Sequence, residues 1–286
     1  MKMTIDCVKC VLDNVFNLAK ENIHDVVQRE ALVRELLEIA GQVSWAVSPP
    51  EYAAKLYSVI DKHSGGKDFF KNIKEQSTAK ALEMLPRLRE LAENSEDPFA
   101  AKVKLAIAGN IIDYGVKPDY CLDSTMEEVL AVLRQPVADK VMQDFRQAVE
   151  NAESILYILD NCGEAVLDSL LLETMKDKVT LGVRGYHIFN DMTPEDIVPS
   201  GLGDYPFVDT GDSTPGVSLC DSSDAFRDIL KKSDLIIAKG QGNFETLTDY
   251  PRSIYFLFRA KCPVVRKFLG GAEKDSIQII GRNADK

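Results

Sequence analysis

The sequence predicts an α/β protein in which a Rossmann-like, mainly parallel sheet flanked by helices follows an all-helical domain. Up to about residue 150 the apolar residues recur only at helical spacing, and beyond that point short apolar runs alternate with helical segments. Such alternation is typical of βαβ units and a parallel sheet. We therefore expect a helical domain over residues 1–150 and an α/β domain over residues 151–286.

Helical segments follow one another through the first half. The earliest repeats apolar residues from Val11 onward, and another begins at Pro50 and ends at the pair Gly65-Gly66, which are common start and stop signals. Pro86 is expected to break a longer segment, because proline lacks the backbone N–H that a helix interior uses. The expected helical segments are residues 11–23, 31–43, 50–66, 69–91, 97–115 and 125–152, the last divided at Pro136.

Short apolar runs in the second half predict strands. They cover residues 154–161, 179–185, 234–243, 253–259 and 275–282. Helices are expected between them, over residues 164–178 and after residue 260. Residues 198–222 are rich in glycine and proline, so we expect a loop there.

Composition and charge exclude several classes of function. The chain has 286 residues, a formal net charge of −11 and an isoelectric point of about 4.9. Nonspecific nucleic-acid binding requires a basic surface, so it is not expected. No apolar run reaches the ~18 residues of a membrane span, and the N-terminus lacks the apolar core of a signal peptide. We expect a cytoplasmic protein that contacts neither nucleic acid nor membrane, and the sequence predicts no particular oligomeric state.

The cysteines do not form a disulfide scaffold, since there are six in 286 residues. Only Cys7 and Cys10 have Cys-x-x-Cys spacing. In a reducing compartment this pair fits free thiols, a metal clip or a redox pair.

Polar residues follow the predicted strands where each strand ends. Asp160-Asn161 follow the first strand, and the sequence up to Glu164 then opens a helix. Asn190-Asp191 lie beyond the second strand, residues 239–243 follow the third, and residues 259–261 (Arg-Ala-Lys) follow the fourth. Ligands of open α/β sheets bind outside the carboxyl ends of the strands. We therefore expect these residues to meet at one edge of the sheet.

Their chemistry suits phosphoryl transfer. Two aspartates and an amide are hard oxygen donors, which favour octahedral divalent cations over metals that prefer thiolates. A cation held by few protein ligands leaves room for water and for a phosphate oxygen. Lys239 adds a positive charge, and Gly240 and Gly242 let backbone N–H groups approach phosphate.

Each feature also has a purely structural explanation. Asp-Asn after a strand is often only a turn or a helix cap, and Asn190-Asp191 before a proline can simply start a helix. The Gly-x-Gly at 240–242 is a weak signal, and no Gly-Lys-Ser/Thr follows it as in a Walker loop. The prediction of a site therefore depends on several such endings falling on one sheet edge.

The segments LDNCGEAVLD (159–168), FNDMTPEDI (189–197) and DLIIAKGQGNFETL (234–247) resemble, in order and separation, the motifs of the DUF89 family of ARMT1-like damage-control phosphatases. Cys-Val-Lys-Cys at 7–10, AIAGNIIDYG at 106–115 and FRAKCPVV at 258–265 resemble its microbial branch with an N-terminal Cys-x-x-Cys. The loop over residues 201–222 fits the family's glycine-rich stretch only loosely.

The resemblance implies a phosphatase that acts on small phosphorylated metabolites, such as sugar phosphates or damaged derivatives. It implies a divalent metal, Mn²⁺, Co²⁺, Ni²⁺ or Mg²⁺, held by Asp160, Asn161 and Asp191. Asp160, Asp191 and Lys239 would be catalytic, with Lys239 holding the transferred phosphoryl group. The expected substrate-binding residues are Asn110, Asp113, Gly163, Glu164, Asn190, Gly240, Gly242 and Asn243.

Several alternatives stay open at this point. The nucleophile is either water or the Asp160 carboxylate. Glu164 either positions water or only complements the helix dipole. A phosphatase of the haloacid dehalogenase type would need Asp-x-Asp after the first strand, and an S-adenosylmethionine-dependent carboxyl methyltransferase would need a glycine-rich loop there; residues 160–162 (Asp-Asn-Cys) supply neither. A non-catalytic sensor of phosphorylated metabolites would use the same residues.

Overall fold

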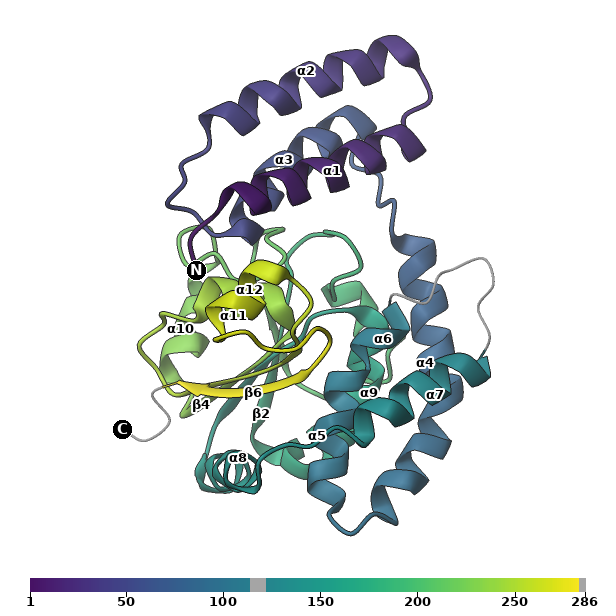
Figure 1. The fold of residues 1–286 in the computed structure, drawn as a ribbon, viewed down its shortest axis with the longest axis vertical. Helices are drawn as coiled ribbons and strands as arrows, with labels where there is room; N and C mark the ends of the chain where they lie inside the picture. Colours follow the sequence, from purple (N-terminus) through teal and green to yellow (C-terminus); the bar gives the residue numbers. More distant parts are fainter. Residues whose placement is uncertain (114–121, 283–286) are drawn as a thin grey trace.

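A six-stranded sheet forms the centre of the computed structural model, which describes residues 1–113 and 122–282 (Figure 1). The strand order is β3-β2-β1-β4-β5-β6, which is the order of doubly wound nucleotide-binding sheets. Strands β1 to β5 pair in parallel, and β6 is antiparallel to β5. The strands are β1 (Ile155–Ile158), β2 (Val179–Val183), β3 (Phe207–Asp209), β4 (Leu235–Lys239), β5 (Ile254–Arg259) and β6 (Ile277–Arg282). The predicted mainly parallel sheet is confirmed.

Helices surround this sheet and extend beyond it. They are α1 (Ile5–Asn22), α2 (Val26–Gln42), α3 (Pro49–Ser64), α4 (Lys71–Glu93), α5 (Pro98–Ala108), α6 (Asn110–Asp113), α7 (Leu122–Leu133), α8 (Asp139–Asn151), α9 (Cys162–Leu172), α10 (Asp224–Lys232), α11 (Gly240–Leu247) and α12 (Pro263–Phe268). Short 3₁₀ turns lie at Glu173–Lys178 and Pro194–Asp196.

Both faces of the sheet are covered, which explains why β1, β4 and β5 are apolar runs rather than alternating ones. Ile155 and Tyr157 of β1 face the core shared with α5, α8 and α9. Leu156 and Ile158 face the opposite core, shared with α10, α11 and α12. Helix α9 is buried along almost its whole length, because α4 and α5 pack over it.

Helix α4 and strand β3 differ from the sequence-based expectation, and α10 and α11 were not among the expected helices. Helix α4 continues through Pro86 instead of breaking there. Its buried residues pack against α9, and this packing offsets the local cost of the proline. Strand β3 lies inside the expected loop of residues 198–222; it is only three residues long and too short to produce an alternating pattern.

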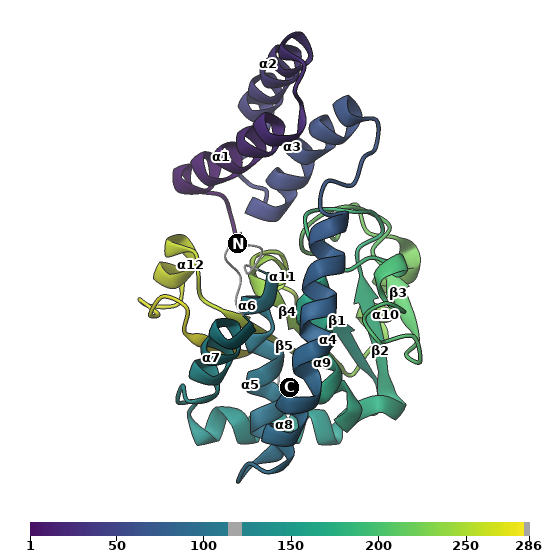
Figure 2. The same cartoon turned by 90° about the vertical axis from the view of Figure 1, so that its right-hand side faces the viewer.

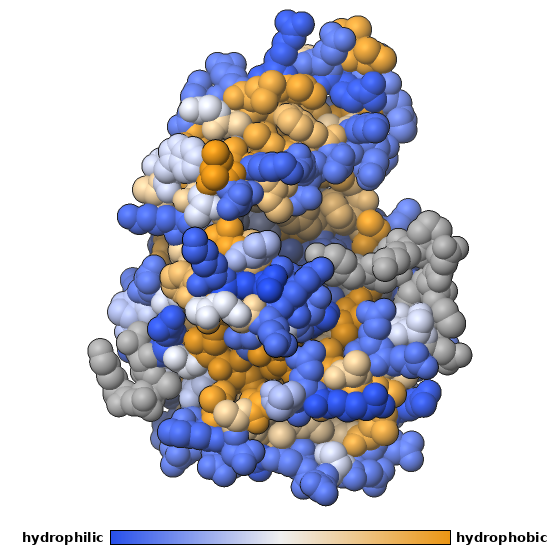
Figure 3. Space-filling view, viewed as in Figure 1, coloured by the Kyte–Doolittle hydropathy of each residue, from blue (hydrophilic) through white to orange (hydrophobic). Residues whose placement is uncertain are grey.

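The helices α1, α2 and α3 form a separate cap above the carboxyl edge of the sheet (Figures 1 and 2). Ile188 and Phe189, from the segment after β2, pack into the apolar core of this cap. On the surface, hydrophobic residues gather over the cap among charged ones (Figure 3). Val27 and Trp45 are among its exposed apolar side chains.

The helical N-terminal region is confirmed, but the packing does not divide at residue 150. Helices α4 and α5 pack on α9 in the same body as the sheet, whereas α1–α3 have their own core. The division into domains at residues 1–150 and 151–286 therefore stays a prediction. None of the described helices has the length and apolar character needed to span a bilayer.

Glu245 in α11 leads to a prediction about pH and stability. Burial raises the pKa of this carboxyl to about 7, although Gln241 and the amino terminus oppose the shift. The unfolded chain has the ordinary pKa near 4.5, so the folded state favours the protonated form. The contribution of Glu245 to the free energy of unfolding is fully present below pH 4.5 and is lost as the pH rises through about 7.

Between pH 4.5 and 7, we expect the free energy of unfolding of the wild type to fall more than that of Glu245→Gln. The difference between the two should reach up to about 3 kcal/mol. Urea unfolding at a series of pH values measures it. The exposed Glu96→Gln change is the control and should leave the pH dependence unaltered. Parallel curves for the wild type and Glu245→Gln would contradict the assignment.

Candidate active site

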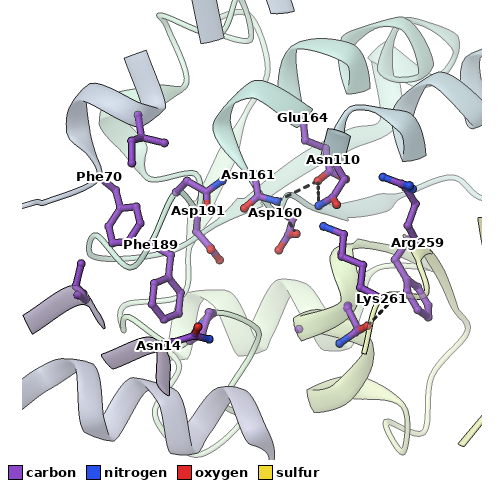
Figure 4. Close-up of a pocket in the computed structure, with 18 of the residues that line it drawn as sticks. Asn14, Phe70, Asn110, Asp160, Asn161, Glu164, Phe189, Asp191, Arg259 and Lys261 are labelled. Atoms are coloured by element: carbon purple, nitrogen blue, oxygen red, sulfur yellow. Dashed lines mark hydrogen bonds between the residues drawn. The ribbon is translucent and has the colours of Figure 1, made fainter. Parts of the chain in front are cut away.

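A pocket of about 630 Å³ opens between the cap and the carboxyl edge of the sheet. Its floor contains the residues after β1 and β2 and the start of α11, and α1 contributes Asn14 from the cap (Figure 4). Asn17 and Glu21 of α1 also line the pocket. The pocket lies where β1 and β4 are neighbours and the chain leaves them toward opposite sides of the sheet. This switch point is the usual ligand site of doubly wound sheets.

Backbone hydrogen bonds tie together the loops that follow β1 and β2. The N–H of Met192 donates to the carbonyl of Asp160 at 2.8 Å, and the N–H of Cys162 donates to the carbonyl of Asn190 at 3.0 Å. Asn161 and Asp191 form an isolated antiparallel bridge. Residues about 30 positions apart in sequence are thus held at fixed positions on one side of the pocket.

The carboxylates of Asp160 and Asp191 lie in this pocket, with side chains 14% and 5% exposed. Burial raises the pKa of Asp160 well above its ordinary value, and the negative charges of Asp191 and Glu164 add to this. Burial also raises the pKa of Asp191, although Arg184 opposes the shift. Both groups would be stabilised as anions by a cation between them.

Arg184, one residue beyond β2, was not among the predicted site residues. It is completely buried, and its Nε donates to Asp191 Oδ2 at 2.8 Å. Its Nη2 donates to Asn243 Oδ1 at 3.2 Å and lies 3.8 Å from Asp160 Oδ1, while Nη1 has no hydrogen-bond partner. The rule that strand ends carry site residues would have identified it.

The amides of Asn161 and Asn110 are oriented by Glu164. Asn161 Nδ2 donates to Asp160 Oδ2 at 3.0 Å and to Glu164 Oε2 at 3.2 Å. Asn110 Nδ2 donates to the same Glu164 oxygen at 3.1 Å, and its own Oδ1 is buried without a hydrogen-bond partner. All of these residues line the pocket.

The structure corrects the role predicted for Lys239. Its ammonium is fully buried and donates to Ala106 O at 2.8 Å, Glu164 Oε1 at 2.6 Å and Asp168 Oδ1 at 2.6 Å. Burial lowers its pKa, but Asp168 and Glu164 outweigh burial and hold the pKa above its ordinary value. An ammonium has three donors, and all three are used by the protein, so Lys239 does not hold a phosphoryl group directly.

The remaining predicted residues divide into two groups. Asn190, Gly240 and Gly242 line the pocket. Gly163 and Asn243 do not; Asn243 is fully buried, and besides accepting from Arg184 it donates to the carbonyl of Lys239 at 2.7 Å. The side chain of Asp113 lies outside the described part of the chain.

A basic side of the pocket comes from the end of β5. Arg259 and Lys261 line it, on the opposite side of Asp160 from Asp191 (Figure 4). They were noted as a polar strand end but were not predicted as site residues. No local pattern separates them from ordinary surface cations, because their role depends on the neighbouring strands.

An aromatic side of the pocket comes from Phe70 and Phe189. Their rings are 5.8 Å apart in an edge-to-face contact, and Tyr57 packs against Phe189 at 5.5 Å. Phe189 has a φ of 46°, an uncommon conformation for a residue with a side chain. The cap therefore holds in place the turn that leads to Asn190 and Asp191.

Cys7 and Cys10 lie at the start of α1, the first buried and the second exposed, and both are free thiols. Among residues 1–113 and 122–282, no group of three or more His, Cys, Asp or Glu is arranged to hold a metal. The metal-clip explanation of the Cys-x-x-Cys pair gains no support from its surroundings.

Comparison with known proteins gives one consistent result. The profile of the damage-control phosphatase ARMT1-like domain matches residues 3–277. The chain is 30% identical to the uncharacterised protein MJ0202 of Methanocaldococcus jannaschii, over 98% of this chain and 95% of the relative. It is 31% identical to the damage-control phosphatase PH1575 of Pyrococcus horikoshii, over 94% of both chains. The crystal structure of that DUF89 protein covers 98% of this chain and 99% of its own, with a TM-score of 0.87 at 29% identity.

Gly240 provides a test of how closely the site is packed. Its φ is 78°, and a Cβ there would lie 2.1 Å from Asp160 Oδ2. Gly65 has a similar φ of 70° but open space around the same position. We expect Gly65→Ala to cost about 1 kcal/mol of stability through backbone strain alone. Gly240→Ala should cost about 1–3 kcal/mol more, because Asp160 must move. Equal losses in urea unfolding would show that the Asp160 carboxylate is free to move aside.

Proposed function

We propose that this chain, which belongs to the damage-control phosphatase ARMT1-like family, is a metal-dependent phosphatase of small phosphorylated metabolites. One observation carries the proposal: buried carboxylates and basic side chains face each other across a single pocket at the switch point of the sheet. Relatives named damage-control phosphatases support it.

The donor set fits a divalent cation. Asp160 and Asp191 face one completely buried cation, Arg184, so the three together carry a net negative charge inside the protein. Asn161 adds an amide oxygen, since both of its N–H groups donate to carboxylates. Oxygen donors suit Mg²⁺, Mn²⁺, Co²⁺ and Ni²⁺, and three protein ligands leave coordination positions open. We assign Asp160, Asn161 and Asp191 as the ligands.

A divalent cation bound there would polarise the phosphoryl group and reduce the repulsion between phosphate and the carboxylates. Arg259 and Lys261 would bind the phosphoryl oxygens from the other side of the pocket. The start of α11 at Gly240 and Gly242 adds the positive end of a helix. These residues take over the function that was predicted for Lys239.

Hydrolysis breaks the bond between phosphorus and the oxygen of the alcohol. In one route, a water oxygen attacks phosphorus directly. In the other, the Asp160 carboxylate attacks phosphorus first, and water then hydrolyses the resulting acyl phosphate. In both routes the leaving alkoxide gains a proton, and inorganic phosphate and the free alcohol are released. Glu164 belongs to the framework of the site, because its carboxylate is engaged by Asn110, Asn161 and Lys239.

The pocket size and lining suit a small metabolite. A volume of about 630 Å³ falls within the usual range for small-molecule sites. Asn14, Asn17 and Glu21 can hydrogen-bond to hydroxyl groups, as on a sugar phosphate or a damaged derivative. We place the phosphate near Lys261 and the organic part toward the cap.

Replacing either carboxylate should abolish most turnover. We expect Asp160→Asn and Asp191→Asn to lower kcat/KM with p-nitrophenyl phosphate and sugar phosphates about a hundred-fold or more, with Mg²⁺, Mn²⁺, Co²⁺ or Ni²⁺ added to metal-stripped protein. Asp209→Asn is the control, because Asp209 also ends a strand but lies outside the pocket. Turnover without metal, or full turnover in both variants, would refute the proposal. Metal-dependent binding without turnover would indicate a sensor, and tight binding of S-adenosylmethionine a methyltransferase.

Lys261→Met should mainly weaken substrate binding. We expect KM for phosphate esters to rise about ten-fold, because a charge-assisted hydrogen bond to phosphate is lost. The exposed Lys267→Met change in α12 removes the same charge outside the pocket and should leave KM unchanged. The same KM in both variants would exclude Lys261 from phosphate binding.

A further inference from the structure

A cluster of buried polar groups lies beneath the pocket and takes no direct part in the proposed reaction. Lys239 is its centre, held between Glu164 and Asp168 at 2.6 Å from each. The side chains of Lys239 and Asp168 are completely buried, and that of Glu164 is 1% exposed. Tyr157 donates its hydroxyl to Asp168 Oδ1 at 2.9 Å.

Burying such a cluster costs desolvation free energy, so its presence is weak evidence that it stabilises the fold. Ionic groups in a protein interior lose their hydration, and apolar residues of similar size often stabilise a fold equally well. Asp168 is incompletely satisfied, since its Oδ2 has no hydrogen-bond partner. Asp168 lies one turn after Glu164 in the buried helix α9, and this second buried carboxylate calls for an explanation other than packing.

The cluster is connected to the pocket through Glu164. One oxygen of Glu164 accepts from Lys239, and the other accepts from the amides of Asn161 and Asn110. With both N–H groups of Asn161 directed at carboxylates, a flipped amide would set its oxygen against two negative charges. The Asn161 amide oxygen is therefore held pointing away from the carboxylates of Asp160 and Glu164.

We propose that Asp168 is a positioning residue of this site: through Lys239 and Glu164 it holds the Asn161 amide with its oxygen available to the cation. The inference depends on the proposed metal site. Asp168 and Glu164 grip the ammonium from two sides, and Ala106 O accepts the third proton. Without the Asp168 charge, Lys239 loses one of its two ionic contacts, and the Glu164 carboxylate that it holds can turn away from the two amides.

Close packing of α5 against α9 fixes the spacing between the residues of this cluster. A Cβ at Gly109 would lie 2.9 Å from Glu164 Cα, so α5 approaches α9 as nearly as a glycine allows. That approach brings Ala106 O and Asn110 to the cluster from α5 and its extension. Because the two helices are already in close contact at Gly109, we expect a change at Asp168 to be passed on mainly through the side chains.

The test measures Mn²⁺ binding to metal-stripped protein by electron paramagnetic resonance, which needs no turnover. We expect Asp168→Asn to weaken Mn²⁺ binding about ten-fold or more, the usual effect of losing a group that orients a metal ligand. Leu230→Ala, in a fully separate core on the other face of the sheet, controls for loss of stability and should bind Mn²⁺ as the wild type does. Wild-type affinity in Asp168→Asn would overturn the inference.

A double-mutant cycle with Glu164→Gln tests whether Asp168 influences metal binding through Glu164. If Asp168 acts through Glu164, adding Asp168→Asn to Glu164→Gln should weaken Mn²⁺ binding less than two-fold further. Fully additive losses would overturn the inference. If Asp168→Asn does not fold, Tyr157→Phe replaces it as the test variant. We expect Tyr157→Phe to weaken Mn²⁺ binding about three-fold, and unchanged Mn²⁺ affinity in this variant would overturn the inference. Failure of the wild type to bind Mn²⁺ would instead refute the proposed function.

Discussion

Asp160 and Asp191 lie buried at the carboxyl edge of the sheet, and the site is organised around the cost of burying their negative charge, which raises the pKa of both carboxyls. Arg184 compensates for part of it from below, within 2.8 Å of Asp191 and 3.8 Å of Asp160. Both carboxyls are ionised together only if more positive charge arrives, because burial otherwise favours their protonated forms. In the proposed function, that charge comes with the bound metal and the basic side of the pocket.

The two halves of the molecule contribute different things to this arrangement. The sheet supplies charged and amide groups from strand ends, which rigid backbone hydrogen bonds hold in register. The cap lines the pocket with Asn14, Asn17 and Glu21 and braces Phe189, whose backbone leads into Asp191. In the proposed function, one short segment after β2 would thus link the binding of the organic part of a substrate to the assembly of the metal ligands.

Sequence patterns predicted the class of fold and much of the site floor, because strand ends in a parallel sheet meet at a known edge. The rule predicted that Asp160, Asn161 and Asp191 would meet at this edge, and all three line the pocket, while their role stays a prediction. The same rule misassigned Lys239, since it does not tell whether a side chain at a strand end points into the pocket or into the layer beneath. Here the carboxylates of Glu164 and Asp168, on the neighbouring helix, draw the ammonium inward. Residues such as Asn14 and Phe70 depend on how the cap sits over the sheet, and no local pattern encodes that.

The central claim is that a divalent cation binds between Asp160, Asn161 and Asp191. The most direct test is a crystal structure of the protein soaked in Mn²⁺, with data collected at the manganese absorption edge. We expect one strong anomalous peak within about 2.0–2.4 Å of oxygens from all three side chains. An anomalous peak at another site, or none at this one with manganese present in excess, would contradict it.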